Sequence, residues 1–128
     1  MARVPRQSNR QLPRYITPRL SGFRVSWVYD INKVMQIAFD SGIASGVMQA
    51  ADIKVRARPY DHYRLVNEGD DFLHVGVFLL AGRTDAQKER VAVILREDLQ
   101  SYLGDVTSIS VDIRDMNPQA YKKRVLPG

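Results

Sequence analysis

Two stretches of the chain repeat apolar residues at helical spacing. The first is predicted at residues 31–41, after Asp30, a residue type that caps helix N-termini, and before Gly42, which is placed to end the helix. Its apolar face is formed by Ile31, Val34, Met35 and Ala38. The second follows Thr84, which opens a capping box, and ends at Gly104. Its apolar stripe is formed by Val91, Ile94, Leu95, Leu99, Tyr102 and Leu103.

Alternation with a period of two predicts strands between and after these helices. Apolar and charged residues alternate at 52–58, where Pro59 is expected to stop the strand, and apolar and polar residues alternate at 108–114. Residues 72–81 are almost continuously apolar, so this strand needs cover on both faces.

The predicted elements repeat along the chain. The helix caps Asp30 and Thr84 lie 54 residues apart, and the two alternating strands have about the same offset. Short extended segments are expected before the first helix, at 14–17 and 23–28. We therefore predict an α+β fold in which two β–α–β units form one four-stranded sheet with both helices on one face.

Residues 1–12 lack such a pattern and are rich in Arg, Gln, Ser and Asn. They are expected to be a basic N-terminal extension with no core to join. Residues 13–128 are then a single domain made of the two halves. Because helices can cover only one face of the sheet, the other face of 72–81, with Phe72, Phe78 and Leu80 or their alternates, is expected to be covered in a closed homo-oligomer.

Composition narrows the chemistry. Hydrophobic residues make up 45% and charged residues 26% of the chain, which is typical of a protein that buries a core. The absence of cysteine excludes disulfides, a thiol nucleophile and cysteine zinc sites, and two scattered histidines do not favour a metal site. No run approaches the roughly 18 to 20 apolar residues that cross a bilayer, and no secretory signal is present, so a cytoplasmic protein without a membrane partner is expected.

The net charge is +5, and much of the excess is terminal. Five arginines fall in the first twenty residues, and Lys122, Lys123 and Arg124 form a second basic run. Such a charge is compatible with nucleic-acid binding or with attraction of small anions. Terminal basic runs are more often solvated tails, and no reader motif or aromatic interleaving supports nucleic acid.

A candidate anion site comes from one predicted strand and its neighbour. Lys54, Arg56 and Arg58 fall on the same side of a strand, and Arg83 ends the apolar strand just before the second helix. Converging guanidinium and ammonium groups suit the recognition of carboxylates and the stabilisation of an anionic enolate. A solvated strand face would show the same alternation, so the spacing alone leaves both readings open.

Other candidate residues have structural interpretations. His74, inside the apolar strand, is expected to be a satisfied core or interface histidine. His62 is expected in a surface loop and Trp27 as a packing anchor.

Four blocks of the sequence together resemble a known family. Residues 51–58, 72–83, 110–116 and 121–124 look like the corresponding blocks of the 5-carboxymethyl-2-hydroxymuconate isomerases, in the tautomerase superfamily. The resemblance covers residues 28–125. It implies two fused copies of a short tautomerase subunit, a homotrimer, no cofactor, and an N-terminal proline as the base.

Carried over by position, Lys54, Arg56 and Arg83 match the family's substrate-binding cations, with Lys54 in place of a more usual arginine. The family's first residue falls at or near Pro13. A proline inside a chain is a tertiary amide without a basic lone pair, so Pro13 is a catalytic candidate only if it is exposed as the N-terminus. The sequence leaves open whether the mature chain starts at Pro13, Ala2 or Met1.

The expected function is that of an isomerase or tautomerase. It would shift a proton within an unsaturated di- or tricarboxylate resembling 5-carboxymethyl-2-hydroxymuconate, in the catabolism of aromatic compounds. The alternative is a catalytically inactive tautomerase-fold protein that binds anions or serves in assembly, because no free N-terminal proline is evident.

Overall fold

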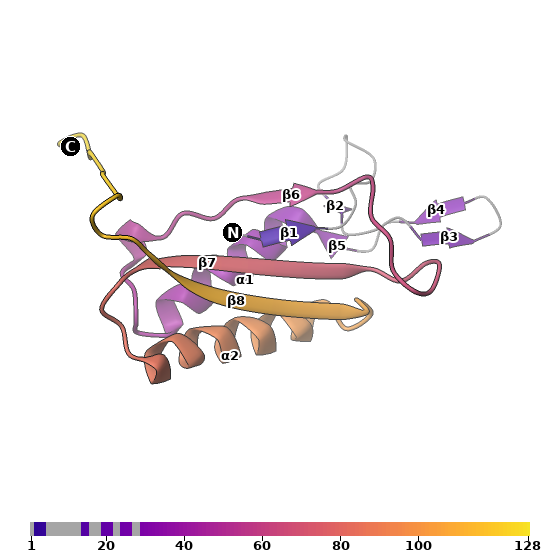
Figure 1. Cartoon of the computed structure of the whole chain (residues 1–128). Coiled ribbons are helices and arrows are strands. Elements are labelled where there is room, and N and C mark those ends of the chain that lie inside the picture. The colour runs from indigo at the N-terminus through magenta and orange to yellow at the C-terminus, as the bar shows by residue number, and fades with distance from the viewer. Residues whose placement is uncertain (1, 5–13, 16–18, 22–23, 27–28) are drawn as a thin grey trace.

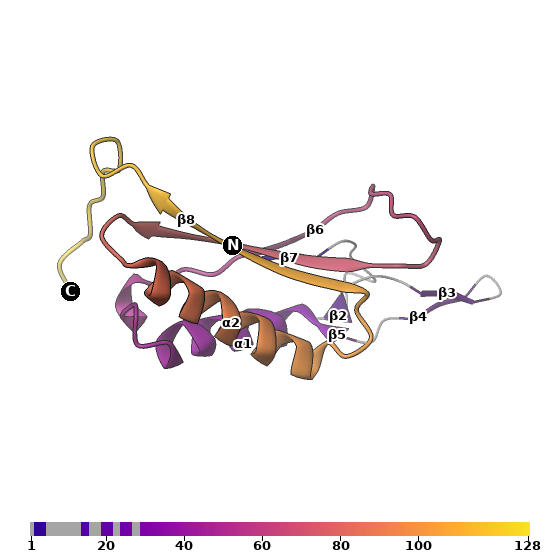
Figure 2. The same ribbon diagram turned by 60° about the horizontal axis from the view of Figure 1, so that its bottom comes forward.

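The computed structural model describes residues 2–4, 14–15, 19–21, 24–26 and 29–128 of the chain. This part of the chain forms two layers, a sheet and a pair of helices (Figure 1). The helices α1 (Ile31–Ala44) and α2 (Asp85–Tyr102) lie side by side against one face of the sheet (Figure 2).

The main sheet has four strands in the order β6-β1-β7-β8. They are β1 (Ala2–Val4), β6 (Ala57–Pro59), β7 (Phe72–Leu80) and β8 (Ser108–Met116). β1 is parallel to β6 and is joined to it through α1, whereas β7 is parallel to β8 and is joined to it through α2. The two pairs meet antiparallel between β1 and β7. The predicted α+β arrangement of two β–α–β units is confirmed.

The first strand differs from what was expected of residues 1–12. Ala2–Val4 pairs with β6 on one side and β7 on the other, so it lies inside the sheet. A strand of three residues is too short to show a period-two pattern, so it could not be predicted from the spacing of apolar residues. The boundary between an extension and a domain at 12/13 stays a prediction.

The segment expected to open the main sheet belongs to a different ladder. β2 (Arg14–Tyr15) pairs with β5 (Tyr29–Asp30) in a separate two-stranded sheet. β3 (Arg19–Ser21) and β4 (Arg24–Ser26) pair with each other. Pro13 and Trp27 lie outside the described residues.

α1 continues past Gly42, where the sequence pattern predicted its end. A Cβ at Gly42 would lie 3.0 Å from Ile53 Cδ1 and 3.2 Å from Met48 Sδ, so glycine permits these side chains to pack against the helix. A glycine with a positive φ angle, 72°, follows shortly after the end of the helix, at Gly46. The N-terminal cap is as predicted, because the Asp30 carboxylate accepts a hydrogen bond from Asn32 N at 2.8 Å.

The predicted strand at 52–58 is shorter than its pattern. A 3-10 helix, η1 (Ala50–Asp52), precedes it, and residues 53–56 lie outside the ladder, which begins at Ala57. β1 begins opposite Ala57, so no described strand pairs with 53–56. Pro59 lies inside β6 and not beyond it, and an edge strand tolerates a residue without an amide hydrogen.

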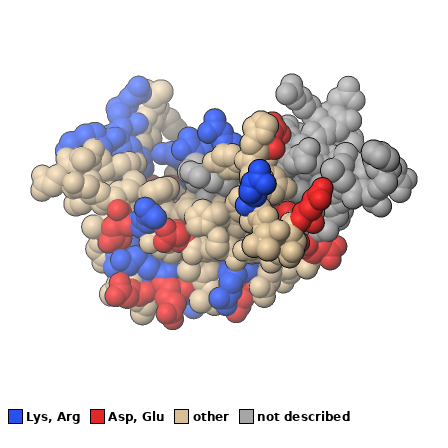
Figure 3. Space-filling view, turned by 45° about the vertical axis from the view of Figure 1, so that its right-hand side comes forward, with Lys and Arg blue, Asp and Glu red and all other residues tan. Residues whose placement is uncertain are grey.

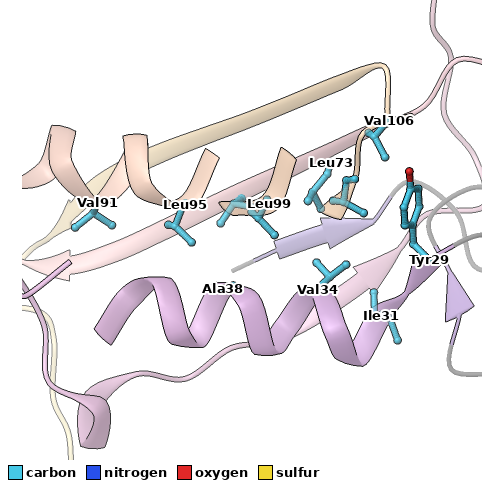
Figure 4. Close-up of a cluster of buried hydrophobic side chains, with 11 residues drawn as sticks. Tyr29, Ile31, Val34, Ala38, Leu73, Val91, Leu95, Leu99 and Val106 are labelled. Atoms are coloured by element: carbon cyan, nitrogen blue, oxygen red, sulfur yellow. The ribbon is translucent and has the colours of Figure 1, made fainter. Parts of the chain in front are cut away.

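The core fills the space between the sheet and the helices (Figure 4). Leu73 and Val75 of β7 are buried there together with Val34 of α1 and Leu95 and Leu99 of α2. Burial of each such side chain contributes about 1.5 to 3 kcal/mol. α2 has the predicted capping box, in which Gln87 N donates to Thr84 Oγ1 and Thr84 N donates to Gln87 Oε1.

Two tyrosines fix the helices at the end of the core opposite Gly42. The rings of Tyr29 and Tyr102 pack edge to face with centroids 5.3 Å apart. Tyr102 Oη accepts from Asp30 N at 3.1 Å, and Tyr29 Oη accepts from Asp105 N at 3.1 Å. The start of α1 and the end of α2 are therefore held together by both stacking and hydrogen bonds.

Candidate active site

A cavity of about 530 Å³ opens where β6 and β7 are not bridged by β1. One wall is formed by residues 52–56, and the other by the C-terminal half of β7, from Val77 to Leu80. Arg83, in the turn before α2, and the C-terminal segment complete the lining.

The sheet register explains this position. Ala2 lies opposite Ala57 of parallel β6 and opposite Val75 of antiparallel β7. Residues before Ala57 and residues after Val75 therefore both extend beyond the N-terminal end of β1. These two segments form walls of the cavity, and Figure 1 shows the short β1 between β6 and β7.

The cavity brings together the three residues that the sequence singled out for substrate binding. Lys54, Arg56 and Arg83 all line it, although they come from two different sides. Arg58, the fourth cation of the predicted cluster, is exposed and lies outside the lining. Their binding role stays a prediction, but their proximity is a property of the fold.

Arg83 is held in place by backbone carbonyls. Its guanidinium donates to Leu80 O at 3.1 Å and to Val47 O at 3.3 Å. Arg90 of α2 donates from Nε to Ser45 O at 2.8 Å and so holds the same loop from outside the cavity. With two hydrogen bonds used, the Arg83 fork is oriented and still has N–H groups for an anion, since a guanidinium carries five.

Two residues of the lining come from the C-terminal segment and were not predicted. Tyr121 is half-buried in the cavity wall, and Lys123 Nζ lies 3.3 Å from Asp52 Oδ1. The sequence showed a basic run there, but no periodicity connects residue 123 with residue 52. Only the turn after β8 brings them together.

The inner end of the cavity is apolar. An adjoining pocket of about 60 Å³ reaches Leu95 of α2 and is apolar apart from Lys54. It shares with the cavity Met48, Ile53, Lys54, Val55 and Val77. The site thus has cations at its solvent side and hydrocarbon toward the helices. Such a combination suits an anion that also carries an apolar part.

The surface charge also concentrates basic side chains on the side of the molecule that carries the cavity residues (Figure 3). In this view basic side chains gather toward the top, on the side of β6 and the C-terminal segment, and most acidic side chains lie lower, near the helices. A cavity edged by cations raises the local concentration of small anions.

The histidines lie elsewhere. His74 is half-buried on the face without helices, where Nδ1 lies 2.7 Å from Ser110 Oγ. It has the hydrogen-bond partner that was expected, and an interface position stays a prediction. His62 is exposed in the β6–β7 connection. Within the described ranges, no group of three His, Cys, Asp or Glu side chains is placed to hold a metal ion. No helix in these ranges is long and apolar enough to cross a membrane.

Solved structures with the same architecture are numerous. A 5-carboxymethyl-2-hydroxymuconate isomerase from Deinococcus radiodurans R1 has a TM-score of 0.66 at 19% identity, over 73% of this chain and 77% of that chain. A native fused 4-OT has a TM-score of 0.65 at 16% identity, over 95% and 89% of the two chains. FG41 malonate semialdehyde decarboxylase has a TM-score of 0.62 at 14% identity, over 97% and 87%.

The fold is that of the tautomerase superfamily. At these identities the comparison establishes the fold alone. No protein-family model matches the sequence, and no curated protein matches it. The tautomerase-fold neighbours include an isomerase, a decarboxylase and a member of the cis-3-chloroacrylic acid dehalogenase family.

Proposed function

We propose that the protein is a cofactor-independent isomerase that shifts a proton within an unsaturated di- or tricarboxylate resembling 5-carboxymethyl-2-hydroxymuconate, in the catabolism of aromatic compounds. The observation that carries the proposal is the convergence of Lys54, Arg56 and Arg83 on one cavity at the N-terminal end of β1. The tautomerase fold of the chain supports it.

The reaction needs a base and a cation. The base removes a proton from the enol oxygen, or from the carbon next to a carbonyl, and the same group returns it at another carbon. Negative charge develops on oxygen between these steps, and cations fixed beside the cavity stabilise it. Arg83 is suited to this task because the backbone already orients its guanidinium.

A chain-terminal amine is the proposed base. Unperturbed α-amino groups have a pKa near 8, and nearby cations lower it by disfavouring the protonated form. Two positions compete for the role: Pro13, if the chain is cleaved before it, and Ala2, if Met1 is removed. The register favours Ala2, since its backbone lies where β1 meets the cavity.

A second candidate function has its own support. Ala2 would supply a primary amine in place of a proline, so the protein could bind unsaturated carboxylates in this cavity without turning them over. In that case Lys54, Arg56 and Arg83 act in binding alone.

The test measures turnover and binding in parallel. Enol–keto conversion of 2-hydroxymuconate and of phenylenolpyruvate is followed by absorbance, and binding of cis,cis-muconate by calorimetry. We expect Arg56→Ala to weaken binding by about 10- to 100-fold, because one charge-assisted contact is worth about 1.5 to 3 kcal/mol. Arg58→Ala is the matched control and should change affinity by less than about twofold.

Each outcome has a meaning. Binding with turnover supports the isomerase, and binding without turnover supports the inactive alternative. If Arg56→Ala and Arg58→Ala weakened binding equally, the anion would be bound by general charge attraction and not at a specific site.

We also propose a homotrimer that buries the face of the sheet without helices. On this face the side chains of Phe78 and Leu80 are 52% and 42% exposed in the single chain. Apolar residues in a row on a sheet favour association. Fused 4-OT structures with this fold are symmetric and asymmetric trimers.

A further inference from the structure

We infer that Lys123 is a fourth carboxylate-binding cation of the cavity and that Asp52 competes with the substrate for it. The inference rests on the proposed function and extends it, because it makes the C-terminal segment part of the binding site. It also assigns to one acidic residue the control of how strongly polyanions bind.

A turn after β8 places the segment. Asn117 Oδ1 accepts from Gln119 N at 2.9 Å, and Asn117 O accepts from Ala120 N at 3.1 Å and from Tyr121 N at 3.0 Å. The chain thereby turns back toward the cavity, which is also lined by Met116 at the end of β8. Tyr121 packs into the wall of this cavity. Lys123 follows two residues later, at the same opening.

Basic residues outnumber acidic residues in the lining of the cavity. Lys54, Arg56, Arg83 and Lys123 line the cavity, and Asp52 is the acidic residue among the described lining residues. Lys123 Nζ is 3.3 Å from Asp52 Oδ1, and their side chains are 34% and 60% exposed. An ion pair this exposed is screened by water and contributes little to folding, so a substrate carboxylate can replace Asp52 at small cost.

Asp52 remains at the cavity after that exchange. It lies in η1, directly before Ile53 and Lys54, so it cannot move far from the site. Its carboxylate then repels the substrate's own carboxylates. Lys123 therefore strengthens binding, and Asp52 opposes it mainly by occupying Lys123.

A purely structural pair would behave differently. If the contact only holds the C-terminal segment in place, then removing either partner has the same effect. In our inference, removal of Lys123 weakens binding and removal of Asp52 strengthens it. The sign of the Asp52 effect therefore separates the two explanations.

The experiment is a double-mutant cycle on the full chain, with cis,cis-muconate affinity measured by calorimetry at fixed ionic strength. We expect Lys123→Gln to weaken binding about tenfold and Asp52→Asn to strengthen it about fivefold, as expected for charge-assisted contacts at a partly solvated site. In the Lys123→Gln background, Asp52→Asn should gain less than about twofold, because its main target is gone.

Lys122→Gln is the matched control, since Lys122 has the same charge one residue earlier but lies outside the cavity lining. It should change affinity by less than about twofold, and thermal unfolding verifies that each variant folds.

Equal loss in Lys122→Gln and Lys123→Gln, or an undiminished Asp52→Asn gain without Lys123, would overturn the inference and leave the proposed function intact. A parent chain that does not bind muconate overturns the proposed function, and the inference with it.

Discussion

Arg83 takes part both in the packing of the fold and in the lining of the cavity. Its two hydrogen bonds join the end of β7 to the loop after α1, and the same guanidinium lines the cavity. The sequence alone predicted a cation at this point but not its anchoring. An effect of Arg83 on folding is therefore expected in addition to the effect on binding.

We predict that Arg83→Ala lowers the free energy of unfolding by about 1 to 2 kcal/mol and weakens dicarboxylate binding at least about tenfold. Arg83→Lys should recover part of the affinity but little of the stability, because an ammonium lacks the planar fork. Denaturant unfolding and calorimetry provide the two measurements. Arg90→Ala is the control, since it releases the same loop from outside the cavity and should lower stability with little change in affinity. A loss of binding in Arg90→Ala equal to that in Arg83→Ala would contradict a direct contact.

Among the residues that line the cavity, the sequence singled out those that follow a pattern. Lys54 and Arg56 were found through strand alternation, and Arg83 through its place at the end of the apolar strand. Lys123 and Asp52 were missed, because their proximity depends on the turn after β8.

On the open face of the sheet, Asp112 and Arg114 lie two residues apart on the same side of β8. The hydrogen bond and the charge of Asp112 raise the pKa of Arg114 above its ordinary value.

Asp71 connects the two long strands at their starts. Its side chain is 1% exposed, and Oδ1 accepts from Thr107 N at 2.8 Å and from Thr107 Oγ1 at 3.2 Å. Its carbonyl accepts from Ser108 N at 3.2 Å, just where β8 begins beside β7. Its burial follows from pairing with Thr107 across 36 residues, which no local pattern in the sequence indicates.

We predict that Asp71→Ala lowers the free energy of unfolding by about 2 to 4 kcal/mol, because the backbone amide and the hydroxyl of Thr107 lose the buried carboxylate that accepts from both. Asp70→Ala, next to it, removes a surface contact with Asn67 and should cost less than about 1 kcal/mol. Chemical denaturation with a common slope provides the comparison. Similar losses for both variants would mean that Asp71 acts through net charge alone.

At the level of elements, periodic segments were predicted well. α2 and its capping box, β7 and β8 were all recognisable, because long amphipathic or apolar runs decide their own structure. The central strand β1 was not recognisable, since three residues carry no pattern and their pairing depends on β6 and β7. The strand predicted at 52–58 was too long for the same reason. The length of β6 is set by the residues of β1 that pair with it.

The whole molecule has one face covered by helices and one face with mixed apolar and polar residues. On the open face, His74 pairs with Ser110, and Phe78 and Leu80 remain exposed. The exposed Phe78 and Leu80 on this face agree with the proposed trimer, in which three sheets would enclose a common centre. The polar pair in its middle would then be buried along with it.

We predict that Ser110→Glu dissociates the assembly, because it places a carboxylate at each subunit's buried sheet face. Native mass spectrometry and light scattering should show a shift from trimer to monomer at equal concentration. Glu97→Lys, on the exposed side of α2, is the control and should leave the trimer intact. A parent chain that is monomeric at all concentrations would exclude the trimer.

The start of the chain decides whether the proposed chemistry can occur. A mature chain beginning at Ala2 would place an α-amine at the edge of the cavity, whereas residues added before it would extend into the strand position between 53–56 and 77–80. A chain beginning at Pro13 would have the secondary amine that the resemblance implies, but it would lack the strand that joins β6 to β7.

We therefore predict a ranking of three forms, each verified by intact mass. The form starting at Ala2 should convert 2-hydroxymuconate, and a form with a short Gly-Ser extension before Ala2 should be about 10² to 10⁴ times slower, because an amide cannot replace the general base. The form starting at Pro13 should unfold at lower denaturant concentration than the other two, since β1 pairs on both sides within the sheet. If that form folds stably and is the most active of the three, then Pro13 is the base and the position of Ala2 in the sheet has no catalytic meaning. If all three convert the substrate equally, the proton is carried by a side chain of the cavity and not by a terminal amine.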